Sequence, residues 1–354
     1  GSSIWRHPQL RIEEAPVPSL LPDQVLIRVK ACGVCGSDVH FYETDDEGYV
    51  LYPGLTRFPV ITGHEFSGVV EDRGSAVTDL QVGDLVTAEE MIWCGRCIPC
   101  RNGFPNHCQH LEEIGFTIDG AMAEYIAMGA KYCWRLTAIA DRLGEEEQAL
   151  ELGALVEPTS VAYNAMFERA GGFRPGAYVA VFGAGPIGLA AVALARAAGA
   201  GLIAAFEVSP ARLGLSQKLG ADFAYDPREA KASETLLSLS DGAGFDFLVE
   251  AAGAPHLTIP EMEPALAINA RIVQIGRAAT RVPMYLEHLQ VRRAQVFGSQ
   301  GHSGHGNFPN VIRLLSSGRL DLSSMITARF PLDQAVEAIV QTSKREDGKV
   351  LVKL

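Results

Sequence analysis

Four cysteines that lie within fifteen residues of one another form the first group in this chain that could do chemistry. The segment reads Cys94-Gly-Arg-Cys97-Ile-Pro-Cys100-Arg-Asn-Gly-Phe-Pro-Asn-His-Cys108. Four thiolates at this spacing can close a tetrahedral shell around one zinc ion. Because such a shell leaves no open position for a substrate, we expect this zinc to be structural. Any catalysis must therefore use other residues.

A second group of possible metal ligands lies nearer the N-terminus. It consists of Cys35 and the adjacent pair His64 and Glu65. A catalytic zinc uses about three protein ligands and keeps one position open, so Glu65 or Glu157 could complete a set begun by Cys35 and His64. Asp38 is a candidate partner that would orient the His64 imidazole. By spacing alone, a cysteine and a histidine almost thirty residues apart are usually unrelated.

A glycine-rich turn in the second half of the chain reads Gly183-Ala-Gly185-Pro186-Ile187-Gly188 and matches G-x-G-x-x-G. It follows a strand-like run and opens an alanine-rich helix, which is the context in which this pattern binds dinucleotides. The glycines allow a tight turn and a close approach to a pyrophosphate, and the helix N-terminus attracts the negative charge. Glu207 would hydrogen-bond a ribose 2′-hydroxyl and favours NAD, whereas Arg212 could accommodate the 2′-phosphate of NADP.

Composition narrows the class of protein. The chain has 354 residues, of which 47% are hydrophobic and 20% charged, and this fits about two globular domains. The net charge of -12 argues against a nucleic-acid surface and against polybasic attachment to a membrane. No secretory signal pattern opens the sequence, so the clustered cysteines indicate metal binding rather than disulfides, and we expect a cytoplasmic protein.

The hydrophobic pattern predicts two kinds of structure. Residues 1 to about 160 contain short apolar runs, with strands expected at 25–30, 66–70 and 83–87 and no strong helical period before about Leu150. Beyond Pro158, strands at 178–182, 202–206, 245–250 and 271–276 alternate with helices at 187–198 and 211–219, the second ending at Gly220. This alternation predicts an α/β domain with a doubly wound parallel sheet.

Two further stretches need an interpretation. The uncharged run 177–195 has nearly the length of a membrane span, but its glycines and proline indicate a strand, a turn and a buried helix instead. The last fifty residues predict helices near Val311 and Gln334 and a strand at 349–353.

These motifs, in this order, resemble the zinc-dependent medium-chain alcohol dehydrogenase superfamily. The resemblance rests on five segments: Cys35-Gly-Ser-Asp, Gly63-His-Glu65, the four-cysteine segment, Val156-Glu-Pro158 and the glycine-rich turn. Within the superfamily the chain is similar to the polyol and sorbitol dehydrogenase branch, and there to the bacterial scyllo-inosose dehydrogenases. The narrower likeness rests on the segments 88–94, 155–164 and 291–306.

The resemblance implies a Rossmann nucleotide-binding domain at 161–300 and a β-rich GroES-like catalytic domain at 1–160, with a structural-zinc lobe at about 90–110. Residues 301–354 would return to complete the catalytic domain. It also implies a homo-oligomer, either a dimer or a homotetramer. The expected cofactor-binding set is Gly183, Gly185, Pro186, Ile187, Gly188, Glu207, Arg212, Ile275 and Ser299.

By the same resemblance, a catalytic zinc would be held by Cys35, His64 and a glutamate. Glu65 takes the ligand position in the polyol branch, and Glu157 stands where the alcohol dehydrogenases of the superfamily's best-known branch place a cysteine. A substrate hydroxyl would bind at the open position and lose its proton through Ser37 and His40, while NAD accepts a hydride. Ser37 could otherwise cap a helix that starts near Asp38.

The leading hypothesis is therefore a zinc- and NAD-dependent dehydrogenase that oxidises a secondary hydroxyl of a cyclitol or polyol. An enzyme of the threonine dehydrogenase type is the alternative with the same chemistry. A zinc-ribbon binding protein is the alternative from another class, and the acidic composition opposes it. An iron–sulfur carrier is a third, but its usual cysteine run has a shorter final gap than the seven residues found here.

Overall fold

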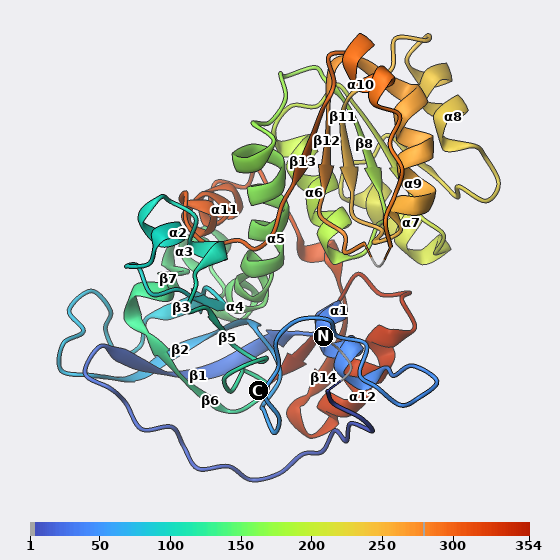
Figure 1. Ribbon diagram of the computed structural model, residues 1–354. Helices are drawn as coiled ribbons and strands as arrows, with labels where there is room; N and C mark the ends of the chain where they lie inside the picture. The colour runs from blue at the N-terminus through green and yellow to red at the C-terminus, as the bar shows by residue number, and fades with distance from the viewer. Residues whose placement is uncertain (1–3, 279) are drawn as a thin grey trace. The chain divides into compact units, whose positions relative to one another are not determined.

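The computed structural model describes residues 4–278 and 280–354, and the chain divides into two compact units (Figure 1). Unit 1 comprises the residues up to Glu157 together with Phe308–Ser317 and Ile326–Leu354. Unit 2 comprises Pro158–Asn307 and Gly318–Met325. The chain thus leaves unit 1, builds unit 2, and returns to unit 1 with its last segments.

Unit 1 is built on a mixed sheet of seven strands with the order β14-β15-β1-β2-β3-β7, and β6 pairs with β1 as well. The long strand β1 (Gln24–Gly33) pairs antiparallel with β2 (Glu65–Arg73), which places Gly33 opposite Glu65. The other strands are β3 (Leu85–Ala88), β6 (Tyr125–Gly129), β7 (Cys133–Arg135), β14 (Ile326–Pro331) and β15 (Lys349–Lys353). Alternate side chains of β1, including Val25, Ile27 and Val29, are buried in the core, as the alternating sequence predicts.

Several helices form in unit 1 where the sequence shows no strong helical period. Unit 1 contains α1 (Gly36–Tyr42), α2 (Ile98–Arg101), α3 (Thr137–Leu143) and α4 (Glu146–Ala154) before α5 (Val156–Tyr163) begins. The first three helices span two turns or fewer, which is too short for a 3.6-residue period to stand out in the sequence. Their short length is compensated by packing, since α1 lies against α12 (Ala335–Ser343) through Val34, Val39 and Ile339.

Unit 2 contains the predicted parallel sheet, with six strands in the order β10-β9-β8-β11-β12-β13. The strands are β8 (Tyr178–Phe182), β9 (Leu202–Phe206), β10 (Phe223–Tyr225), β11 (Phe245–Glu250), β12 (Leu266–Gln274) and β13 (Gln295–Gly298). Helices flank the sheet in Figure 1, namely α6 (Pro186–Ala197), α7 (Pro210–Lys218), α8 (Ala232–Leu239), α9 (Pro255–Met262) and α10 (Leu286–Val291). The doubly wound α/β architecture is confirmed.

The run 177–195 forms β8, a turn and the buried helix α6, as expected. Among the described residues, no helix combines the length and the apolar character that crossing a membrane would require. The structure also contains elements that the pattern did not predict, chiefly β10, β13, β14 and a π-helical stretch (Asn164–Arg169) that continues α5. The helix near Val311 is α11 (Asn307–Ser316), and the final predicted strand is β15.

Candidate active site and cofactor site

The end of β1 and the start of α1 position the first group of candidate side chains. Cys35 is the N-cap residue of α1, and its backbone N–H donates to Asp38 Oδ2 at 2.8 Å. The other oxygen of Asp38 accepts from the backbone N–H of Gly63 at 3.3 Å, next to His64. Asp38 is fully buried and so joins two segments of chain that each carry a candidate metal ligand.

The structure brings Cys35, His64 and Glu65 together. One ligand atom from each residue lies within 4.8 Å of the other two, and His64 and Glu65 are buried. His64 Nδ1 lies 3.9 Å from Asp38 Oδ1 and has no hydrogen-bond partner among the described residues. A sulfur, an imidazole nitrogen and a carboxylate oxygen are the donors of a catalytic zinc site. The donor set therefore fits a zinc ion with a position left for substrate.

The charges around these ligands are strongly coupled in the protein without metal. Burial alone disfavours the His64 imidazolium, but the hydrogen bond with Cys35 and the Asp38 charge together hold the pKa of His64 well above its ordinary value. Burial raises the pKa of Asp38, and the opposing effect of His64 is smaller. The site thus concentrates acidic and basic groups away from water, which is typical of functional sites.

Glu157, the other carboxylate considered for the metal, lies in the first turn of α5 and is also buried. The Glu157 charge acts on both His64 and the Lys349 ammonium. Glu157 therefore lies near the cluster formed by Cys35, His64 and Glu65, here called the Cys35 group. Its carboxylate lies within 4.8 Å of that of Glu90, a buried residue that sequence reasoning did not single out. Of the two carboxylates, Glu65 is the one that groups with Cys35 and His64.

Ser37 and His40 both lie on α1, but in different surroundings. Ser37 does not cap a helix, since α1 begins at Gly36, and its buried Oγ has no hydrogen-bond partner among the described residues. The interpretation of Ser37 as a cap is therefore wrong. His40 Nδ1 lies 3.2 Å from Glu43 Oε2, and the His40 side chain is 40% exposed.

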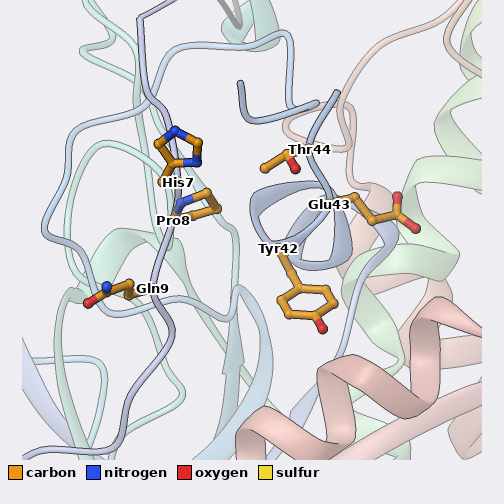
Figure 2. A pocket seen from close by; sticks show the side chains of 6 residues that line it. All are labelled: His7, Pro8, Gln9, Tyr42, Glu43 and Thr44. Atoms are coloured by element: carbon orange, nitrogen blue, oxygen red, sulfur yellow. The ribbon is translucent and has the colours of Figure 1, made fainter. Parts of the chain in front are cut away.

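A surface hollow of about 530 Å³ opens at the C-terminal end of α1 (Figure 2). Its lining consists of the N-terminal segment and the end of α1, namely His7, Pro8, Gln9, Tyr42, Glu43 and Thr44. None of the candidate zinc ligands lines it. Glu43, which contacts His40, is the one lining residue that connects this hollow with the candidate site residues on α1.

Aromatic side chains form one wall of the Cys35 group. The Phe116 and His64 rings lie 4.8 Å apart between centroids, and Tyr52 and Phe41 pack on Phe116 at 5.0 and 5.4 Å. Phe116 and Tyr52 thus lie next to the candidate ligand His64. Tyr42 instead lines the surface hollow.

The four-cysteine lobe has the geometry of a closed metal site. The sulfur atoms of Cys94, Cys97, Cys100 and Cys108 all lie within 4.8 Å of one another, and all seven cysteines of the chain are free thiols. Cys97 Sγ and Cys108 Sγ are 3.8 Å apart. This is the sulfur–sulfur distance expected for tetrahedral zinc with zinc–sulfur bonds of about 2.3 Å. Backbone N–H groups of Cys94 and His110 donate to Cys108 Sγ, both at 3.3 Å. The residues therefore fit a structural zinc.

Backbone N–H groups also prepare some of these sulfurs for metal binding. The N–H of Arg96 lowers the pKa of the Cys94 thiol to about 6, whereas burial raises the pKa of Cys100 to about 12. The lobe is flanked by the short pair β4 (Met91–Ile92) and β5 (Glu112–Glu113). Glu89 accepts hydrogen bonds from the indole N–H groups of Trp93 and Trp134, both at 3.1 Å, which fastens the lobe to β7.

In unit 2, the glycine-rich turn joins β8 to α6. Gly183 has φ +90°, and a Cβ there would lie 2.6 Å from the Cα of Ala252, so this position requires glycine. A Cβ at Gly185 would meet only Arg212 Nη1, at 3.8 Å, so the space in front of Gly185 is open. The turn thus presents backbone N–H groups beside open space at the N-terminus of α6, which fits a pyrophosphate.

Glu207 lies beside the turn at the end of β9 and already accepts hydrogen bonds. Its Oε2 accepts from the Ala184 N–H at 2.8 Å, and its Oε1 accepts from the N–H groups of Val208 and Ser209 at 2.7 and 3.0 Å. Since each carboxylate oxygen can accept two hydrogen bonds, Oε2 retains capacity for a ribose hydroxyl. Sequence reasoning did not foresee that the same carboxylate holds the turn in shape.

The remaining predicted cofactor residues follow β12 and β13. The Ile275 N–H donates to the Glu250 carbonyl at 2.9 Å, and the Ser299 N–H donates to the Gln274 carbonyl at 3.1 Å. Asn164, which was not predicted as a site residue, donates to Ser299 Oγ at 3.3 Å and to the Gly301 carbonyl at 3.0 Å. It fixes the start of the loop 299–307 within unit 2.

Comparison with known proteins agrees with this geometry. Residues 21–138 match the alcohol dehydrogenase GroES-like domain, and residues 186–317 match the zinc-binding dehydrogenase domain. The chain therefore belongs to the zinc-binding, medium-chain alcohol dehydrogenase family, and it is an enzyme of the alcohol or polyol dehydrogenase type. The predicted family and fold are confirmed.

Among its relatives, the chain is 47% identical to scyllo-inosose 3-dehydrogenase of Thermotoga maritima, over 97% of this chain and 90% of the relative. It superposes with a TM-score of 0.97 on a solved structure of a Thermotoga maritima protein assigned as an alcohol dehydrogenase. That match has 46% identity and covers 100% of this chain and 92% of the other. A Sinorhizobium meliloti protein assigned as a zinc-binding dehydrogenase, solved with NADP, is 28% identical with a TM-score of 0.85, over 96% and 94% of the two chains.

Proposed function

We propose that this enzyme uses zinc and NAD to oxidise a secondary hydroxyl of a cyclitol or polyol to a ketone. The observation that carries the proposal is the convergence of Cys35, His64 and Glu65 in one buried cluster, beside a serine hydroxyl that has no intrachain partner among the described residues. The substrate class is supported by the 47% identity to scyllo-inosose 3-dehydrogenase.

Cys35, His64 and Glu65 would hold the catalytic zinc, and the four cysteines of the lobe would hold a second, structural zinc. The catalytic ion would supply Lewis acidity, which lowers the pKa of a bound hydroxyl towards neutrality. Asp38 accepts hydrogen bonds from the N–H groups of Cys35 and Gly63, and so it holds the two segments that carry Cys35 and His64 next to each other. Losing such a partner typically costs 10–100-fold in metal affinity or activity.

The proton of the substrate hydroxyl would leave through α1. Ser37 Oγ is buried beside Cys35 and is suited to accept a hydrogen bond from the hydroxyl. His40 lies about one helical turn further on, and its contact with Glu43 fixes Nδ1 as the donor, so Nε2 can take up a proton. The His40 side chain is 40% exposed, so a proton that it takes up can pass directly to water.

NAD would bind along the glycine-rich turn of unit 2 and accept the hydride. The carboxylate of Glu207 disfavours a 2′-phosphate and can still accept a bond from a ribose hydroxyl. Val208, the next residue, is apolar and offers no side-chain donor to a phosphate. Replacing Glu207 with alanine should reduce the preference for NAD over NADP, and an unchanged ratio of kcat/KM for the two coenzymes would show that selectivity arises elsewhere.

The substrate class can be tested by following NADH absorbance with a panel of inositols, inososes, sorbitol, xylitol and threonine. We expect turnover of cyclitols or polyols. Turnover of threonine with no reaction on cyclitols and polyols would instead support a threonine dehydrogenase.

The metal role can be tested with Cys35→Ala. This variant should fold and bind NADH like the wild type but lose more than about 10³-fold in kcat, because the ligand set is broken. The matched control is Cys32→Ala, which removes a buried thiol of β1, three residues before Cys35, that belongs to neither metal group. Full activity of Cys35→Ala would overturn the assignment.

We further propose that the enzyme is a cytoplasmic homo-oligomer. Seven free thiols suit a reducing compartment. Strand β13 forms one edge of the unit 2 sheet, and exposed apolar side chains, among them Val296, Leu286 and Val291, lie on β13 and α10. An exposed apolar edge strand is a template for pairing with a second copy. Val296→Lys should shift sedimentation towards the monomer, and an unchanged oligomer would exclude this edge as the interface.

A further inference from the structure

The buried lysine Lys349 is the most unusual charged group in unit 1. It is the first residue of β15 and its side chain is entirely inaccessible to solvent. A buried ammonium needs a paired charge and hydrogen bonds to be tolerated. Lys349 Nζ makes an ion pair with Glu65 Oε2 and donates to the Val34 carbonyl at 3.2 Å. Its partner is thus a residue of the proposed zinc site, 284 positions away in sequence.

The backbone around this ion pair is shaped to accommodate it. Gly33 lies opposite Glu65 in the β1–β2 pairing. A Cβ at position 33 would overlap Glu65 Oε2 and would lie 3.3 Å from the Cδ of Lys349. The carboxylate and the lysine stem therefore occupy the space that a side chain at 33 would fill. Negative charges at Cys35 and Glu157 also act on the same ammonium.

We propose that Lys349 is the positioning residue of the catalytic metal site. Its ammonium holds Oε2 of Glu65 and leaves the other oxygen as the single donor that Glu65 offers to the metal, beside Cys35 and His64. This inference rests on the proposed zinc site. It adds that the ion pair, through the glutamate, sets the number of donors around the metal.

Cobalt replacement at this site gives a readout that is independent of catalysis. Four-coordinate Co²⁺ absorbs visible light more strongly than Co²⁺ with five or six donors, and thiolate ligation adds a charge-transfer band in the near ultraviolet. The enzyme would be loaded with Co²⁺ after mild chelation that leaves zinc in the four-cysteine lobe. The spectrum of Cys35→Ala, loaded in the same way, would be subtracted to remove any contribution of the lobe.

In Lys349→Met the Glu65 carboxylate is released and can offer both oxygens, so the visible bands should weaken while the Cys35 band persists. Zinc affinity, measured by competition with a chelator, should rise by at least about tenfold, because Glu65 gains a free donor oxygen and the site loses a neighbouring positive charge. Lys349→Arg keeps a cation on Oε2 and should restore most of both properties. A Lys349→Met spectrum and zinc affinity equal to those of the wild type would overturn the proposal.

A second variant keeps the test decisive if Lys349→Met fails to fold. Gly33→Ala leaves every charge in place but pushes Glu65 away from Lys349, so it should weaken the visible bands in the same direction. Gly36→Ala is the matched control, because a Cβ there meets nothing within 4 Å. Equal spectra for Gly33→Ala and Gly36→Ala would contradict the proposal. If the wild type itself lacks the charge-transfer band that Cys35→Ala removes, the proposed function fails instead.

Discussion

Alanine substitutions at three glycines of unit 2 should distinguish three effects: backbone strain, a steric clash with the protein, and obstruction of cofactor binding. Gly176 and Gly183 have almost the same positive φ, +88° and +90°. A Cβ at Gly176 meets nothing within 4 Å, whereas a Cβ at Gly183 would lie 2.6 Å from both the N and Cα of Ala252. Gly185 has φ -67°, which any residue adopts, and open space in front of it.

The magnitudes follow from these differences. Gly176→Ala should lower the free energy of unfolding by about 1–2 kcal/mol, the cost of a left-handed backbone for a residue with a Cβ. Gly183→Ala adds a contact with rigid backbone, for a total of about 3–5 kcal/mol. Gly185→Ala should leave stability within about 0.5 kcal/mol of the wild type, because it meets neither strain nor protein atoms.

Cofactor binding should follow a different order. Urea unfolding gives the stabilities, and calorimetric titration with NADH gives the affinities. Gly176→Ala should bind normally, since the residue lies outside the turn, while Gly185→Ala should lose at least about tenfold in affinity because its methyl group occupies the space proposed for the pyrophosphate. Normal NADH affinity in Gly185→Ala would refute the placement of the cofactor, and equal stabilities of Gly176→Ala and Gly183→Ala would refute the steric reasoning.

Two further outcomes are expected in unit 1. Cys97→Ser should lower the melting temperature, and it should reduce the zinc content by about one ion per chain. At low temperature the variant should still be folded and should keep the zinc at Cys35. Retention of both zinc ions would exclude the lobe as a metal site. Bonds from Arg329, opposed by partial burial, lower the pKa of Glu151 from 4.5 to about 2. This depressed pKa stabilises the fold fully above about pH 4.5, and the stabilisation is lost as pH falls towards 2. Solvent screening at the half-exposed Arg329 limits this stabilisation to about 1–2 kcal/mol. In urea titrations, the free energy of unfolding of Glu151→Gln should therefore be lower than that of the wild type by this amount at pH 7, and the two values should converge near pH 2. A constant difference between the two proteins across this pH range would contradict the assigned pKa.

Features encoded over short stretches could be predicted from the sequence. The lobe places four cysteines within fifteen residues, and the glycine-rich turn follows its strand directly, so spacing alone indicates both. The strands of unit 2 were predictable because buried parallel strands are continuous apolar runs. The short helix α1 gave no periodic signal, because its seven residues are ordered by the Asp38 contacts and by packing on α12 rather than by an amphipathic period.

Contacts between distant segments could not be predicted in the same way. The pairing of Lys349 with Glu65 depends on β15 adding to β1 after the chain has built a whole second unit. Glu207 could be placed near the ribose by its distance from the turn, but its bonds to Ala184, Val208 and Ser209 appear only in three dimensions. The residue types alone left the third ligand open between Glu65 and Glu157, the family resemblance favoured Glu65, and the structure groups Glu65 with Cys35 and His64.

The central claim is that Cys35, His64 and Glu65 hold the catalytic zinc. The most direct test is anomalous X-ray scattering at the zinc edge from crystals of the active enzyme. We predict two zinc peaks per chain, one among the four cysteines of the lobe and one about 2.3 Å from Cys35 Sγ and about 2.0–2.2 Å from His64 and Glu65. A single peak in the lobe, with no metal density beside Cys35 in a fully active preparation, would contradict the account.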